Sequence, residues 1–150
     1  MFRQAERSVR NTALDILSRR EHTRLELFRK LKAKEFSEEE IEAQIDTLIN
    51  EGLQSDERYT ESYVNMRRNR GYGPLKIKQE LQQRGISSEL VNSFVEFNDE
   101  IWIDTAYQAY EKKFAAKPLD SANERAKRMR FLQSRGFTGD IIQAIFTRFG

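Results

Sequence analysis

The chain has 150 residues, which suits one domain or a short array of small ones. An apolar fraction of 38% and a charged fraction of 33% indicate that much of its surface stays in water. It contains no cysteine, which excludes disulfides, thiolate catalysis and zinc–thiolate sites. No apolar run approaches the ~18 residues of a membrane span, and residues 1–10 lack the apolar core of a signal peptide. We therefore expect a cytoplasmic protein without membrane contact.

Helical spacing of apolar residues begins near the N-terminus. Val9, Ala13 and Ile16 fall at positions i, i+4 and i+7, which predicts an amphipathic helix. Further helices are predicted where a Ser or Thr precedes a Glu by three positions, as in a capping box: Thr23–Glu26, Ser37–Glu40 and Ser121–Glu124. Pro74 follows Gly73 at the first position of another predicted helix, where a missing N–H has no cost. No run of alternating β-branched residues predicts a strand, so the fold class is all-α.

The helical pattern repeats along the chain. Residues 31–37 align with residues 81–87 and 132–138, at offsets of 50 and 51, by a leucine, an apolar residue and a Ser or Thr cap. In the predicted first helices, Ile16 aligns with Met66 at the same offset of 50. We therefore predict three tandem three-helix repeats in a bent, solenoid-like array, divided as residues 1–52, 53–99 and 100–150. Each repeat has few large apolar residues, so neighbouring repeats are expected to share a core.

Glycines mark the predicted turns between the second and third helices. Gly85 and Gly136 each follow an arginine, where a left-handed residue commonly ends a helix. The first repeat has Glu35 at this position, so its turn is expected to be built differently.

Residue types that support catalysis are scarce. His22 is the only histidine, which excludes multi-histidine metal sites, and its place before the Thr23 cap predicts a hydrogen-bonding turn residue. The carboxylates of residues 38–40 open a predicted helix, where its dipole favours them. Residues 70–73 lack the spacing and the lysine of a Walker loop. We predict no enzymatic activity, no cofactor and no metal.

Basic residues gather in two stretches, residues 67–84 and 112–135. The predicted third helices begin with acidic residues, which disfavours a helix-turn-helix that reads bases, so contacts to a polyanion are expected to be phosphate-directed. Tyr72, in a turn among arginines, is predicted either to be an exposed contact or to pack back onto its own repeat. The candidate contacts to a filament or to DNA are Arg67, Arg68, Arg70, Tyr72, Lys76, Arg84, Arg125, Lys127, Arg128, Arg130 and Arg135.

A specific stretch resembles a known family. Residues 55–59, 63–64 and 67–68 lead into the densest part, which comprises Arg70-Gly-Tyr-Gly-Pro74, Ile77, Glu80-Leu81 and Arg84-Gly-Ile86. This stretch is similar to the central signature of RecX, the bacterial regulator of the recombinase RecA. Residues 16–31 resemble the N-terminal signature of that family, and residues 130–137 resemble its C-terminal one. Glu35 in place of a usual glycine, and Leu53-Gln54 in place of a usual Tyr-Leu, depart from the pattern.

The resemblance implies three three-helix repeats and binding along the groove of a RecA filament on single-stranded DNA. There the chain would act as a monomer that limits filament growth, ATP hydrolysis and strand exchange, and so modulates DNA repair and recombination in the SOS response. Two other classes stay open from the residues: an autonomous nucleic-acid-binding helical repeat protein and a protein-only adaptor. We expect the patch of Arg125, Arg128 and Arg135 to contact DNA, and the patch of Arg67, Arg68 and Arg70 to contact the recombinase.

Overall fold

The computed structural model describes residues 7–97, 100–115 and 117–149. Within these ranges every regular element is a helix, which confirms the all-α class. The absence of a signal peptide was predicted from residues 1–10, and residues 1–6 of this segment lie outside the described residues. Residues 98–99, at the predicted boundary between the second and third repeats, also lie outside them. None of the described helices is long and apolar enough to cross a membrane.

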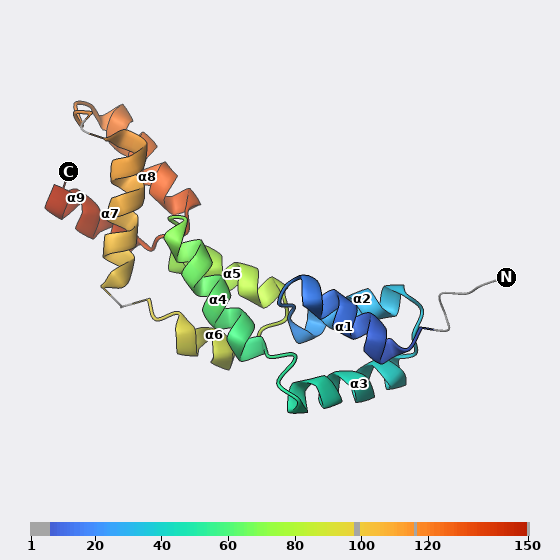
Figure 1. Ribbon diagram of the computed structural model, residues 1–150. Coiled ribbons are helices and arrows are strands. Elements are labelled where there is room, and N and C mark those ends of the chain that lie inside the picture. Colours follow the sequence, from blue (N-terminus) through green and yellow to red (C-terminus); the bar gives the residue numbers. More distant parts are fainter. Residues whose placement is uncertain (1–6, 98–99, 116, 150) are drawn as a thin grey trace.

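The helices form three groups of three, which lie one after another in an elongated array (Figure 1). The first group comprises α1 (Val9–Arg19), α2 (Arg24–Ala33) and α3 (Glu38–Asn50). The second group comprises α4 (Asp56–Asn69), α5 (Pro74–Gln83) and α6 (Ser88–Phe94). The third group comprises α7 (Ile101–Phe114), α8 (Ala122–Ser134) and α9 (Gly139–Phe149). This arrangement confirms the predicted helical repeat fold.

The predicted caps form, but only one is a reciprocal capping box. The side chains of Thr23, Ser37 and Ser121 each accept a hydrogen bond from the backbone N–H three residues later. Only at α2 does the glutamate also return the bond, since Glu26 accepts from the Thr23 N–H over 3.0 Å. At α8, Glu124 instead accepts a bond from Arg128 at 3.0 Å, which draws its carboxylate away from the cap.

The turns between the second and third helices share a left-handed residue. Gly85 and Gly136 adopt positive φ values of 84° and 95°, as predicted for residues that end helices. Glu35 adopts φ 71°, and its N–H donates to Lys32 O as the N–H of Gly85 donates to Gln82 O. The N–H of Ile86 also donates to Leu81 O, and the N–H of Phe137 donates to Leu132 O, whereas the described backbone bonds include none from Phe36 to Leu31. The expectation of a different turn therefore holds for the hydrogen bonds but not for the left-handed residue. A non-glycine residue held there is strained by about 1 kcal/mol, which the rest of the repeat must offset.

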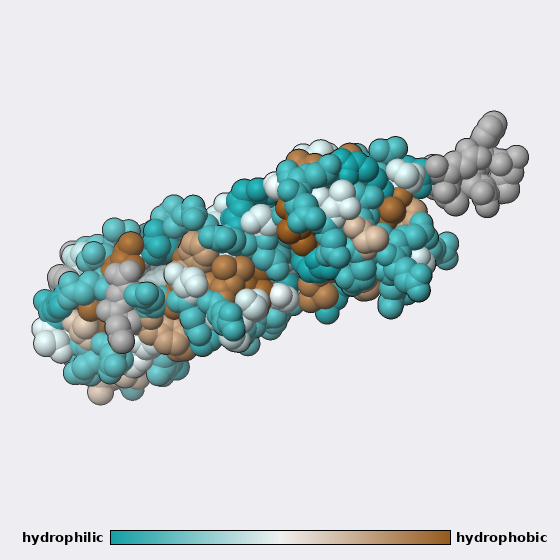
Figure 2. Space-filling view, turned by 90° about the horizontal axis from the view of Figure 1, so that it is seen from below, coloured by the Kyte–Doolittle hydropathy of each residue, from teal (hydrophilic) through white to brown (hydrophobic). Residues whose placement is uncertain are grey.

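The described residues form two hydrophobic cores rather than one. Residues of the second and third groups, including Ile77, Trp102 and Phe137, share a single core cluster. The first group has its own core around Leu27 and Ile45. The expectation of a shared core therefore holds only for the second and third groups. On the face that Figure 2 shows, hydrophilic residues dominate and apolar residues gather in separate patches.

The first helices follow the predicted offset of 50 only in part, since Ala13 and Tyr63 are both buried at this offset. Ile16 is buried, whereas its predicted counterpart Met66 is 37% exposed. On α4 the buried side chains are Tyr59 and Tyr63, as predicted from the offset, and their neighbours Thr60 and Val64. Met66 therefore lies outside the core, where its side chain is open to contact.

Candidate interaction surface at the two joints

The first and second groups meet where the start of α2 touches the turn between α5 and α6. We call this contact the first joint. The Thr23 hydroxyl donates to the carbonyl of Arg84 over 2.7 Å. Gly85 lies so close to α2 that an added Cβ would be 2.6 Å from the Cβ of Leu25. The Arg24 N–H also donates to Asp56 of α4 at 2.8 Å, so the start of α2 is fixed from two sides.

The second and third groups meet in the same way, at what we call the second joint. Here the start of α5 touches the turn between α8 and α9. The N–H of Gly73 donates to the carbonyl of Arg135 over 2.7 Å, and the N–H of Leu75 donates to Gly136 over 2.9 Å. An added Cβ on Gly73 would lie 2.6 Å from the Gly136 backbone. Gly73 and Arg135 follow Thr23 and Arg84 by 50 and 51 positions, so the repeat reproduces its own joint.

Tyr72 packs inside the second joint. The guanidinium of Arg67 lies 3.7 Å from the centre of its ring, and the guanidinium of Arg135 lies 4.7 Å from it. One cation comes from α4 and the other from the end of α8, so the ring connects the two groups. Tyr72 is half-buried and contacts both its own group and the next one.

Arg67 is also held by a carboxylate. It makes two hydrogen bonds to Glu80, of 2.9 and 2.8 Å, and the Tyr63 hydroxyl donates to the same carboxylate over 2.8 Å. Burial, followed by this hydrogen bond to Glu80, raises the pKa of Tyr63 to about 12. Arg67 therefore organises the second group, and little of its charge is free for a partner.

His22 occupies at the first joint the position that Tyr72 occupies at the second. Its ring is buried, and its Nδ1 lies 2.9 Å from the carbonyl of Arg20, which can only accept, so Nδ1 carries the proton. Its Nε2 is buried without a partner among the described residues. Burial lowers the pKa of His22, so the ring stays neutral. The amide of Gln54, one of the residues that depart from the family pattern, donates to the His22 carbonyl over 3.2 Å.

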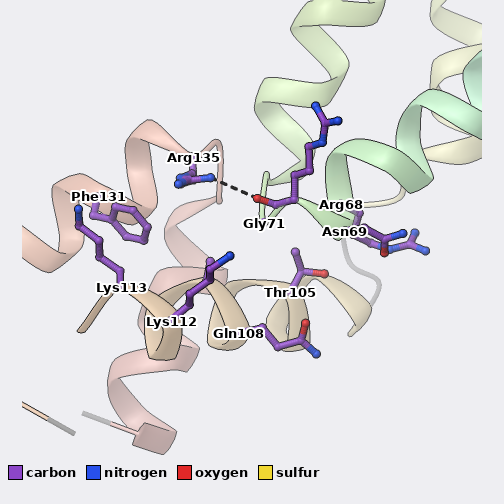
Figure 3. A pocket seen from close by; sticks show the side chains of 11 residues that line it. Arg68, Asn69, Gly71, Thr105, Gln108, Lys112, Lys113, Phe131 and Arg135 are labelled. Carbon is purple, nitrogen blue, oxygen red and sulfur yellow. Dashed lines mark hydrogen bonds between the residues drawn. The ribbon is translucent and has the colours of Figure 1, made fainter. Parts of the chain in front are cut away.

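A hollow of about 340 Å³ opens beside the second joint (Figure 3). We call it the second-joint hollow. It is lined by Arg68, Asn69, Arg70, Gly71, Thr105, Gln108, Ala109, Lys112, Lys113, Phe131 and Arg135. In Figure 3, Arg135 reaches from the end of α8 toward the turn after α4, where it donates to the carbonyl of Arg70 at 3.3 Å, and Lys112 rises from α7. Among the residues that the structure describes, five cations line this hollow and no carboxylate does.

A second hollow, of about 390 Å³, occupies the corresponding place beside the first joint. We call it the first-joint hollow. It is lined by Arg20, Glu21, Tyr59, Ser62, Tyr63 and Met66. Each hollow is lined by the two residues that follow the first helix of one group, which are residues 20–21 in one hollow and 70–71 in the other. Each is also lined by one face of the first helix of the next group, at positions i, i+3, i+4 and i+7, counted from Tyr59 in one hollow and from Thr105 in the other. The two sites are therefore equivalent in the fold but differ in chemistry, since Met66 stands where the other hollow has Lys112.

The structure removes Arg128 from the candidate contacts. Its side chain is buried, at 2% exposed, and donates to Glu124, to the Tyr110 hydroxyl and to the carbonyls of Lys117 and Pro118. These bonds outweigh its burial and raise its pKa further. A guanidinium that is buried and makes four hydrogen bonds inside the fold is not available to a phosphate, so the prediction that Arg128 shares an exposed patch was wrong.

The remaining candidates differ in how far their charge is already engaged. Arg84 lies over the Tyr63 ring at 4.8 Å and 3.9 Å from Glu26, Arg125 lies over Phe146 at 4.4 Å, and Lys76 lies 5.6 Å from the Tyr72 ring. Arg70, Lys127 and Arg130 are exposed and make no ion pair with any described residue. Arg68, Arg70 and Arg135 line one hollow, so the two patches expected to be separate meet there. Lys112 and Lys113, in the basic stretch but not selected, join them.

Groups of acidic and histidine residues that could hold a metal do not occur among the described residues. The features that distinguish the molecule are thus the two repeated joints and the hollows beside them.

Three family models match consecutive parts of the chain. They are described as the first, second and third three-helix domains of RecX, and they match residues 10–48, 55–93 and 99–146. The chain is 41% identical to the regulatory protein RecX of Pseudomonas fluorescens over 93% of this chain and 90% of that one. It is 40% identical to the regulatory protein RecX of Legionella pneumophila (strain Corby), over 91% of each.

Solved structures agree. The crystal structure of RecX from Lactobacillus salivarius superposes with a TM-score of 0.83 at 31% identity, covering 93% of this chain and 92% of that one. A second crystal structure of a regulatory protein RecX gives 0.82 at 26% identity, covering 93% and 72%. With three domain models in order, relatives above 40% identity along nearly the whole chain and the same fold, this protein belongs to the RecX family of regulatory proteins.

Proposed function

We propose that this chain inhibits a RecA recombinase by binding the RecA filament on single-stranded DNA, where it limits filament growth, ATP hydrolysis and strand exchange. Its partners would be the recombinase and the DNA within or beside it, and it would act in the cytoplasm as a monomer without catalysis of its own. The name of the relatives supports a regulatory role. The filament as the target follows from the resemblance stated above.

One observation carries this proposal. The same joint, repeated at an offset of about one group, produces an elongated array with two equivalent hollows of different chemistry. Tyrosines and Met66 line the first-joint hollow, as suits contact with protein, whereas cations line the second-joint hollow, as suits contact with a polyanion. A filament of protein on DNA presents both kinds of surface side by side at regular intervals.

An elongated array gains affinity from such a target. Once one group is bound, the others are held near the adjacent sites, so several weak contacts act together without new chemistry. The hydrogen bonds at both joints fix the spacing of the groups, which reduces the entropy lost when all groups bind.

The test is the rate of ATP hydrolysis by a RecA recombinase on single-stranded DNA, measured as this protein is added. We expect inhibition well below one molecule per recombinase subunit, because a block at a growing end needs few copies. Inhibition only at saturating amounts would indicate simple competition for DNA. Unchanged hydrolysis at every ratio would contradict the proposal.

The second-joint hollow also supports a second candidate, an autonomous nucleic-acid-binding helical repeat protein. Such a protein would bind single-stranded DNA tightly without the recombinase and with a steep dependence on salt, and it would leave filament ATP hydrolysis unchanged unless it covered the DNA.

A further inference from the structure

The charge of the second-joint hollow is unusual for its place in the fold. Two of its cations, Lys112 and Lys113, lie in the last turn of α7, and Arg68 lies in the last turn of α4. Cations at helix C-termini are favoured by the helix dipole, and this is the structural explanation that the site must be weighed against. The dipole accounts for a cation at each helix end. It does not account for five cations lining one hollow with no carboxylate among its described lining residues.

The first-joint hollow shows that the joint itself does not require this charge. Its equivalent positions carry Met66 instead of Lys112, Ser62 instead of Gln108 and Glu21 instead of Gly71. Glu21 also pairs with Arg58 at 2.6 Å, so the acid at the first joint is matched by a base nearby. The same backbone arrangement is thus built once with balanced charge and once with positive charge alone. The fold therefore does not explain the excess of positive charge at the second joint, which indicates a role in binding.

We propose that the second-joint hollow binds a backbone phosphate of a single-stranded nucleic acid. The cationic donors are Arg70, Lys112 and Arg135. Arg70 and Lys112 make no ion pair with any described residue, and Arg135 makes one hydrogen bond, to the carbonyl of Arg70. Gln108 and Asn69 add neutral side chains that can donate hydrogen bonds at the rim. The nature of the nucleic acid rests on the proposed function, whereas the recognition of phosphate rests on the lining residues.

The lining also explains why the strand should be single. Phe131 is half-buried in the hollow, with the guanidinium of Arg135 at 5.1 Å and the Lys113 amine at 5.8 Å from its ring centre. Aromatic rings and guanidinium planes beside a phosphate site stack on bases, and only an unpaired strand exposes the faces of its bases. The phosphates of a duplex could also bind in the hollow, but its paired bases would not contact this apolar surface.

Binding at this place would join two groups. Arg68 and Arg70 belong to the second group, and Lys112 and Arg135 belong to the third. A phosphate between them would neutralise cations that otherwise repel one another across the joint. The ligand would therefore strengthen the second joint and leave the first unchanged.

The experiment measures the fluorescence anisotropy of a labelled oligothymidylate with the full chain and no recombinase, over a series of salt concentrations. The test variant carries Arg70→Gln and Lys112→Gln, and the control carries Arg29→Gln and Lys34→Gln, which lie in the first group away from the hollow and are not among the candidate contacts. All four side chains are exposed, so folding should be retained in both, and both variants lose the same charge. We expect roughly tenfold weaker binding for the test variant, and a salt slope smaller by roughly 0.7 for each phosphate that it no longer binds. The control should change little.

Competition by unlabelled ligands separates the sources of phosphate. Unlabelled oligothymidylate should displace the probe, whereas ATP and inorganic phosphate should require far higher concentrations. Equal weakening in the two variants would overturn the proposal, because it would indicate a diffuse field rather than a site. Displacement by ATP as effective as by the oligonucleotide would equally overturn it in favour of a free nucleotide site, and failure of the wild-type chain to bind the probe would overturn it as well.

The outcome is distinguishable from failure of the proposed function. If the wild-type chain binds DNA through Arg70 and Lys112 but leaves recombinase ATP hydrolysis unchanged, the hollow stands and the proposed function fails. If the wild-type chain inhibits the recombinase and the test variant binds the probe as tightly as the wild type, the proposed function stands and the hollow fails.

Discussion

The backbone N–H of Gly73 donates to the carbonyl of Arg135 over 2.7 Å, and the Thr23 hydroxyl donates to the equivalent carbonyl of Arg84 over the same distance. One joint thus uses a side chain where the other uses the backbone. Both joints are close, because an added Cβ would lie 2.4 Å from the Cβ of Lys76 if built on Gly136 and 2.6 Å from the Cβ of Leu25 if built on Gly85. The repeat therefore preserves the contact between groups while changing the atoms that make it.

This close approach predicts the effect of Gly136→Ala on the free energy of unfolding. The new Cβ would lie 2.4 Å from the Cβ and 2.6 Å from the backbone nitrogen of Lys76, and residue 136 has φ +95°. Strain and overlap together should lower the free energy of unfolding by more than about 2 kcal/mol, measured by urea unfolding. Gly52→Ala is the control, since φ there is +76° but nothing lies within 4 Å. Its free energy of unfolding should fall by only about 1 kcal/mol. Equal losses in the two variants would show that the second joint can accommodate the added Cβ without a loss of stability.

At the first joint, Thr23→Val should cost more than the loss of a helix cap. The variant loses the cap of α2 and the bond to Arg84, and we expect a loss of about 2 kcal/mol in the free energy of unfolding. Ser121→Ala is the matched control because Ser121 caps α8 without bonding to another group. It should lose about 1 kcal/mol. If the Thr23 variant were as stable as the Ser121 variant, the hydrogen bond at the first joint would contribute nothing to the free energy of unfolding.

His22 predicts a dependence of stability on pH. Burial lowers the pKa of this imidazole below its ordinary value of 6.5, so the unfolded chain takes up the proton first. The stability that the neutral His22 contributes is fully present above pH 6.5, and it is lost as the pH falls from 6.5 through the lowered pKa. Thermal unfolding should therefore show a decrease in stability on mild acidification that is smaller in His22→Gln. Parallel pH profiles for the two proteins would contradict a buried neutral His22.

Replacing Arg128 should damage the fold rather than an interaction surface. Arg128→Met keeps much of the side-chain volume but leaves the Tyr110 hydroxyl, the Glu124 carboxylate and two carbonyls without their donor. We expect a loss of about 2–4 kcal/mol in the free energy of unfolding. The control Arg130→Met, at an exposed position, should stay within about 0.5 kcal/mol of the wild type. Two variants of equal stability would return Arg128 to the candidate contacts.

Much of this protein follows from local rules that the sequence displays directly. Helical spacing of apolar residues, Ser and Thr caps and the recurrence of Leu31, Leu81 and Leu132 determine the helices and their grouping, because these signals act within one or two turns of chain. The left-handed turns at Gly85 and Gly136 follow in the same way. Glu35 shows the limit of residue type as a guide, since the repeat imposes φ 71° on a residue that disfavours it.

Only the tertiary structure decided which cations are available. Arg67, Arg70 and Arg128 look alike in the sequence, yet one pairs with Glu80, one is exposed and one is buried on Tyr110. The same is true of the hollows, because residues 70 and 112 line one hollow only when the second and third groups stack. Helix formation depends on neighbours along the chain, whereas the environment of a charge depends on groups that are distant in sequence and meet only at the joint.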